Sequence, residues 1–188
     1  MSTEEEIKNM RHHDEIRFAI DRYIEAVCAL CPHFKETVRI STIFFVRLMT
    51  LCEVEPKAIV MASLLFARFF EARQDTFSLC AIFRCSFTCI MISNKLLEDV
   101  PYANTIWADM AQKCCVETLT EEDERQQLCS CWSLEMVNMM EFEFLGTIGC
   151  QLAIEDVECP YVDCIVSEWD DRFTDWQRQQ QQRGIKTE

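Results

Sequence analysis

Glycine is the feature that most narrows the folds open to this sequence, because only three of its 188 residues are glycine. Sheet proteins rely on glycine for the positive φ angles of tight turns, so this composition argues against a β-sandwich or a barrel. The four prolines separate long glycine-free stretches and are tolerated at the first position of a helix. The sequence therefore predicts an all-α protein.

Apolar periodicity and the prolines place the expected helices. The first four are expected at about residues 14–31, 36–52, 57–72 and 78–98. A fifth follows Pro101, and the fourth is apolar on nearly all sides, which is typical of the centre of a bundle. The sixth and longest should begin at a capping box of Thr118 and Glu121 and run to Gly146, with Gly146 and Gly149 as C-terminal caps.

The two ends of the chain differ from its middle. Residues 1–11 predict a flexible acidic arm, and residues 177–188 predict a polar, glutamine-rich tail. A last amphipathic helix is expected at about residues 159–177. Between the arm and the tail we expect one domain, at residues 12–176.

The charge of the chain narrows the class of partner. Acidic residues outnumber basic ones 32 to 18, for a net charge of −14. Such a surface repels phosphate backbones and anionic lipid heads, so we expect neither nucleic acid nor a membrane as partner. The most apolar stretch, Leu79–Ile92, is shorter than the roughly 20 residues that span a bilayer, and it predicts a buried core helix.

Thirteen cysteines raise the question of disulfides or metal. The first residues are polar and do not resemble a secretion signal, and most of the cysteines lie in apolar periodic segments. A tetrahedral zinc site needs further ligands at suitable spacing, and the chain has three histidines. We therefore expect reduced thiols, no metal and a location in the nucleus or cytoplasm.

The glycine positions also exclude several enzyme motifs. Neither G-x-G-x-x-G nor G-x-x-x-x-G-K-[ST] nor G-x-S-x-G occurs, so we expect no cofactor and no small-molecule substrate. A cysteine nucleophile with His33 as its base stays open. The interpretation that we favour is a protein that is not itself an enzyme.

Two charges lie among apolar neighbours. Glu141 shares a helical stripe with Val137 and Leu145, so it either reaches water at the edge of the stripe or meets a partner. Lys95 ends the apolar fourth helix, where a cation complements the helix C-terminus. Periodicity alone does not decide between these interpretations.

Longer stretches around these charges resemble the cyclin box, and specifically that of the Pho-type (P/U-type) cyclins. The stretches are IFRCSFTCIMISNKLLEDVPYANTIWADMA and VNMMEFEFLGTIGCQL. In these cyclins an arginine opens the central helix, a lysine closes it, and an acidic residue, an asparagine and an aromatic–alanine pair follow. The matching residues are Arg84, Lys95, Asp99, Asn104, Trp107 and Ala108, then Asn138 and Glu141, with Arg47 and Arg68 in the two preceding helices.

The resemblance implies a single five-helix cyclin box, at about residues 36–154, flanked by an N-terminal and a C-terminal helix. It implies a regulatory subunit that binds and activates a cyclin-dependent protein kinase by positioning the kinase C-helix. Lys95 and Glu141 would lie side by side and hydrogen-bond the kinase. The apolar half of the interface would comprise Leu96, Leu145, Cys150 and Leu152.

The sequence departs from this family in three places. Ser93 and Asn94 stand where an alanine–serine pair is more usual. Cys150 stands where an aromatic residue is usual, and residues 113–135 contain an acidic insertion that would extend a helix or contact the kinase. Two alternatives stay open. One is a cyclin-box scaffold without a kinase partner, and the other is a thiol-dependent helical enzyme.

Overall fold

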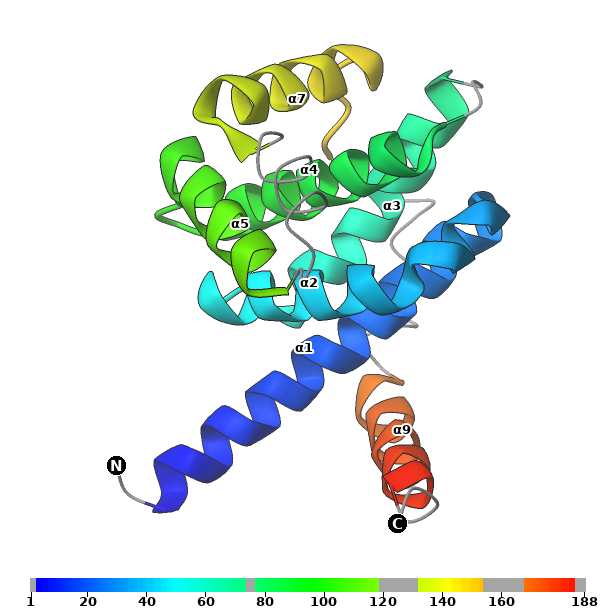
Figure 1. Ribbon diagram of the computed structural model, residues 1–188, viewed down its shortest axis with the longest axis vertical. Helices are drawn as coiled ribbons and strands as arrows, with labels where there is room; N and C mark the ends of the chain where they lie inside the picture. Colours follow the sequence, from blue (N-terminus) through cyan, green and yellow to red (C-terminus); the bar gives the residue numbers. More distant parts are fainter. Residues whose placement is uncertain (1–2, 74–76, 119–131, 154–167, 185–188) are drawn as a thin grey trace. The chain divides into compact units, whose positions relative to one another are not determined.

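The computed structural model describes residues 3–73, 77–118, 132–153 and 168–184 (Figure 1). Over these residues the protein is helical and has no β-strand, which confirms the all-α prediction. The chain forms two compact units, Met1–Leu152 and Ala153–Glu188. The region predicted as one domain, residues 12–176, is therefore divided after Leu152.

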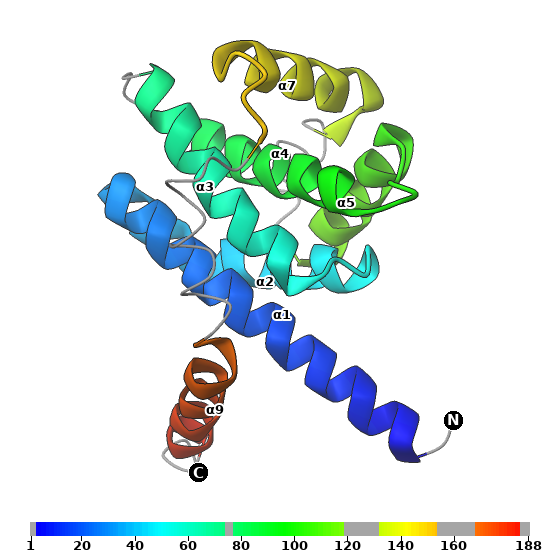
Figure 2. The same cartoon turned by 180° about the vertical axis from the view of Figure 1, so that it is seen from behind.

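The first unit is a bundle in which each helix has at least one helical neighbour. Its described helices are α1 (Thr3–Leu30), the 3₁₀ helix η1 (Pro32–Thr37), α2 (Val38–Leu51), α3 (Pro56–Arg73), α4 (Leu79–Leu97), α5 (Asn104–Thr118) and α7 (Leu134–Thr147). Helix α4 packs against α3 and α7 and lies between them in both views (Figures 1 and 2). Helix α1 packs on α2 and α3, while α5 packs on α2 and α7.

Helices α2, α3 and α4 lie within two residues of their predicted bounds, because local signals fix their ends. Helix α3 begins at Pro56, and the Ser78 side chain caps α4 by accepting a hydrogen bond from the Ala81 amide at 3.2 Å. The predicted arm at residues 1–11 is wrong from Thr3 onward. Residues 4–8 are Glu-Glu-Glu-Ile-Lys, mostly strong helix formers, and α1 extends through them.

The start of the sixth predicted helix also needs correction. Thr118 is the last residue of α5, and Glu121, its partner in the predicted capping box, lies outside the described residues. Helix α7 begins at Leu134, where the Ser133 side chain accepts a hydrogen bond from the Met136 amide at 3.2 Å. A single helix from Thr118 to Gly146 is therefore wrong, and only the two ends of the predicted insertion at 113–135 are described.

Helix α7 ends in a Schellman motif. The Cys150 amide donates to the Leu145 carbonyl at 2.8 Å, and the Gly149 amide donates to the Gly146 carbonyl at 3.3 Å. Gly149 has φ +62°, the left-handed conformation that glycine adopts without steric cost. The prediction of a cap at Gly149 is confirmed, while Gly146 lies inside the helix and the prediction for it is wrong.

The second unit contains α9 (Trp169–Gly184). The tail predicted at residues 177–188 is helical as far as Gly184, because glutamine and arginine are good helix formers. Ion pairs one turn apart, between Arg172 and Glu168 and between Arg178 and Asp175, add a little stability. Residues 159–167 of the predicted last helix lie outside the described residues.

Helix α4 forms the core of the first unit, as predicted. Every residue from Ile82 to Asn94 is buried except Arg84. Among the described residues α4 is also the one helix long and apolar enough to cross a membrane by length and composition, and 67% of that window is buried inside the protein.

Trp132 completes this core from outside the helices. Its ring is fully buried, stacks on Phe44 at a centroid distance of 5.6 Å and lies 4.5 Å from the Phe87 centroid. Its indole N–H donates to the Cys115 sulfur at 3.0 Å. The side chain therefore joins α2, α4 and α5 immediately before α7 begins.

Replacing Trp132 with alanine should lower the free energy of unfolding by about 3–5 kcal/mol, because a large cavity would open against Phe44 and Phe87. Urea denaturation followed by circular dichroism measures the change. Phe142→Ala is the matched control, since that ring is 80% exposed and its loss should change stability by less than about 0.5 kcal/mol. Equal effects of the two substitutions would contradict the role of Trp132.

Candidate functional site

A network of polar side chains joins the end of α4, the start of α5 and the middle of α7. The Lys95 ammonium donates to Glu141 Oε1 at 2.6 Å and to Asn104 Oδ1 at 2.5 Å. Asn104 Nδ2 donates to Glu141 Oε2 and to Asn138 Oδ1, each at 2.7 Å. We call these four residues the polar network.

The polar network lies at the edge of the protein, where it is partly shielded from water. The Lys95 and Glu141 side chains are 21% and 23% exposed. Their opposite charges compensate each other, and hydrogen bonds between charged groups are stronger than those between neutral ones. The network is thus electrically neutral and still open to a partner on one side.

The structure brings together residues that are 46 positions apart in the sequence, Lys95 and Glu141. The side-by-side placement that the cyclin resemblance implies is therefore present. Glu141 is neither an isolated edge charge nor buried alone, and Lys95 does more than complement the end of α4. Asn104 and Asn138, expected only as family-motif residues, supply the remaining hydrogen bonds of the network.

The predicted apolar half of the interface is only partly covered. Leu96, beside Lys95, is 44% exposed, and Cys150 is exposed with a left-handed φ of +57°. Leu145 and Leu152 are half-buried. All four therefore keep some surface that a partner can contact.

Three of the other motif residues connect helices around the network. Arg47 on α2 forms an ion pair with Glu117 on α5, and Trp107 is buried edge-to-face against Phe87. On α3, Arg68 donates to the Gln151 carbonyl at 2.6 Å and so supports the end of α7. Asp99 is exposed in the connection between α4 and α5.

Sequence reasoning missed several exposed apolar residues on the same three helices and their connection. Phe142, next to Glu141, is 80% exposed, and Val100, five residues after Lys95, is 87% exposed. Together with Leu96 they belong to an exposed apolar set that also includes Leu97, Tyr102, Ile106 and Met139. Phe142 is an aromatic residue that lies off the apolar stripe of its helix. Its position in the sequence could therefore have predicted an exposed apolar side chain.

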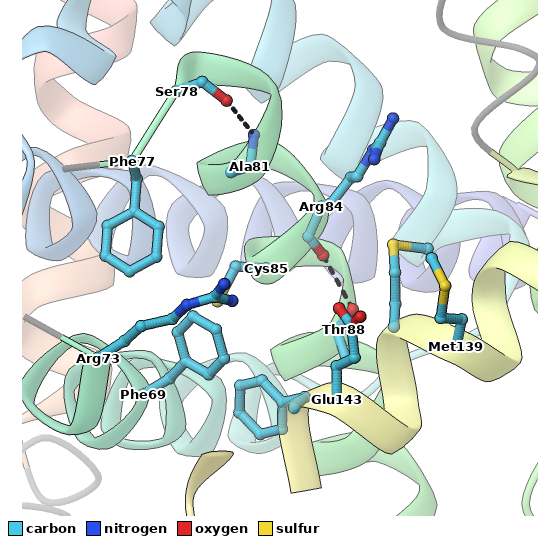
Figure 3. A pocket seen from close by; sticks show the side chains of 12 residues that line it. Phe69, Arg73, Phe77, Ser78, Ala81, Arg84, Cys85, Thr88, Met139 and Glu143 are labelled. Carbon is cyan, nitrogen blue, oxygen red and sulfur yellow. Dashed lines mark hydrogen bonds between the residues drawn. The ribbon is translucent and has the colours of Figure 1, made fainter. Parts of the chain in front are cut away.

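A cavity of about 490 Å³ opens between α3, α4 and α7 (Figure 3). Phe69 and Phe144 stack in its wall at a centroid distance of 5.1 Å, and Arg73 lies over the Phe69 ring. Arg84, the predicted motif residue, also lines it. The described lining contains no histidine, so it lacks the usual base for a thiol or hydroxyl nucleophile.

Two of the described thiols are protonated, buried groups. Burial raises the pKa of the Cys52 thiol to about 12 and that of Cys114 to about 11, so both stay protonated at neutral pH. The His33 Nε2 lies 2.9 Å from the Phe77 carbonyl, to which it must donate. All nine described cysteines are free, and no group of His, Cys, Asp and Glu among the described residues could hold a metal ion.

Comparison of the chain with protein-family models, with curated proteins and with solved structures found no match. The function is therefore argued from the polar network, the exposed apolar set and the sequence motifs that they contain.

Lys95→Ala and Glu141→Ala should each lower the free energy of unfolding by about 1–2 kcal/mol, because each leaves a partly shielded charge without its partner. The double variant should lose less than the sum, with a coupling of about 1 kcal/mol. Urea denaturation of all four proteins gives this value. The Arg178/Asp175 pair, 68% and 65% exposed, is the control and should show almost no coupling. Additive effects at Lys95 and Glu141 would contradict the network.

Stability should also fall in alkali because of Cys52. In the unfolded chain this thiol loses its proton near its ordinary pKa of 9.0, whereas the folded protein keeps the proton to about pH 12. The unfolded state then binds fewer protons, so the free energy of unfolding falls as the pH rises above 9. Cys52→Ala should make this decline shallower in urea denaturation at a series of pH values. An unchanged slope would show that the thiol does not titrate in this way.

Proposed function

We propose that this protein is a regulatory cyclin subunit that binds and activates a cyclin-dependent protein kinase. In this proposal α2, α3, α4, α5 and α7 are the five helices of a cyclin box, and α1 is the N-terminal flanking helix. The chain supplies no catalytic residue, and its partner is the kinase itself.

The observation that carries the proposal is the contact between Lys95 and Glu141. Two of the three ammonium donors of Lys95 are used within the network, and each oxygen of Glu141 accepts one hydrogen bond there. A carboxylate oxygen can accept a further bond, and an ammonium group has three donors, of which two are used here. This pair is thus equipped to bond backbone donors and acceptors of a partner.

The apolar residues on either side of the pair fit the same function. A stable interface combines a few polar contacts with apolar anchors, and exposed aromatic residues are frequent anchors. In the sequence, Leu96 directly follows Lys95 and Val100 comes five residues after it, whereas Phe142 directly follows Glu141 and Leu145 comes four residues after it. The outer side of the kinase C-helix would pack on these side chains and be held inward.

Activation would follow from the position of that C-helix. Kinases need the ion pair between a strand lysine and a C-helix glutamate, together with correctly placed Mg²⁺ ligands. A subunit that holds the C-helix inward stabilises this arrangement without touching the transferred phosphate. The polar network that would make these contacts is itself neutral, although the chain carries a net charge of −14.

Binding to a panel of purified cyclin-dependent kinases tests the proposal. The full chain should bind at least one of them and raise its phosphorylation rate, and Lys95→Ala/Glu141→Ala should weaken binding by about 30-fold, as expected for loss of a central contact. Phe142→Ala should weaken binding by about tenfold. Arg178→Ala/Asp175→Ala removes an ion pair from the second unit and should leave binding unchanged.

Circular dichroism and thermal unfolding of every variant separate loss of binding from loss of fold. If the wild-type chain bound none of the kinases, the proposed function would be wrong. If it bound one and the double variant bound equally well, the interface would lie elsewhere on the protein.

A further inference from the structure

Asn104 is the centre of the polar network. Its carbonyl oxygen accepts from the Lys95 ammonium, and its amide nitrogen donates to both Glu141 and Asn138. Reversing the amide would place two donors against Lys95 and an acceptor against a carboxylate. The partners therefore allow one orientation of this side chain.

Few side chains can make this set of bonds. The position requires one acceptor and two donors at the end of a short side chain, and a primary amide provides these groups. Aspartate has no donor when ionised, and serine has a single one. Asn138 has a simpler task, because it accepts one bond from Asn104, and aspartate could do the same.

The Asn104 backbone is well fixed. Asn104 is the first residue of α5, where the Ala103 carbonyl accepts from the Ile106 and Trp107 amides. Trp107, three residues later, is fully buried. Core packing thus places the amide at a defined height between the end of α4 and the face of α7.

We propose that Asn104 is a positioning residue that holds Lys95 and Glu141 in the arrangement that the partner recognises. This inference rests on the proposed function. Without the amide, the ammonium and the carboxylate would keep their attraction, but each would lose one of the bonds that fix its direction. A partner would then have to order both side chains on binding, which costs affinity.

The same chemical change at two neighbouring positions tests the proposal. Asn104→Asp removes both donors, sets a second carboxylate against Glu141 and competes with it for Lys95. Asn138→Asp keeps the acceptor that Asn104 uses. Aspartate is favourable in the first turn of a helix, so Asn104→Asp should not weaken α5 through its helix propensity.

With a kinase that binds the wild-type chain, Asn104→Asp should weaken binding at least tenfold, and Asn138→Asp less than threefold, with thermal unfolding of the two variants alike. Asn104→Ser, which keeps one donor, should fall between them. Equal binding by Asn104→Asp and wild type would overturn the proposal, as would equal losses at both positions. If Asn104→Asp and Asn104→Ser both failed to fold, Asn104 would be a structural residue and the proposal would be wrong.

A measurement without any kinase separates this inference from the proposed function. The Lys95 ammonium should give an observable ¹⁵N–¹H signal by NMR in the wild type and in Asn138→Asp, because fixed hydrogen bonds slow its exchange with water. Asn104→Asp should shift or broaden that signal. An unchanged signal in Asn104→Asp would overturn the positioning role even if kinase binding were found, and a changed one would support that role even if no kinase bound.

Discussion

Helix α4 constrains the first unit more than any other element, because nearly all of its surface must be kept from water. It is buried from Ile82 to Asn94 except at Arg84, and α3, η1 and α7 pack on it together with aromatic side chains of α2 and α5. The helix leaves the core at its first and last turns. Lys95 therefore emerges at a fixed place, beside the start of α5 and the middle of α7, and meets acceptors that apolar packing has already positioned.

Packing and polar contacts thus have separate tasks in this protein. Burial of α4, Trp107 and Trp132 sets the helix positions. The polar network is partly exposed and forms between helices that this packing has placed. The polar network is itself neutral, although the chain carries a net charge of −14. Exposed apolar residues lie on the same helices and their connection, with Val100 and Phe142 the most exposed, and in the proposed function they would supply contact area.

Part of the site could be predicted from the sequence. Lys95 and Glu141 were recognisable as charges on apolar faces, and family resemblance implied that they meet. Their link through Asn104 could not be read from helical spacing, because spacing describes neighbours within one helix and these three residues lie on three helices. Phe142 was missed because helical periodicity identifies the buried stripe of a helix and does not show which residues of the exposed face could contact a partner.

The sequence by itself determined the all-α class and most helix ends, since proline, serine caps and glycine act on their own neighbours. Pro56, Ser78 and Gly149 mark such ends. Only the tertiary structure decided between competing signals, as where α7 begins at Leu134, capped by Ser133 and directly after the buried Trp132. It also decided which charges meet, because contacts between residues distant in the sequence depend on how whole helices pack, and that depends on the entire core.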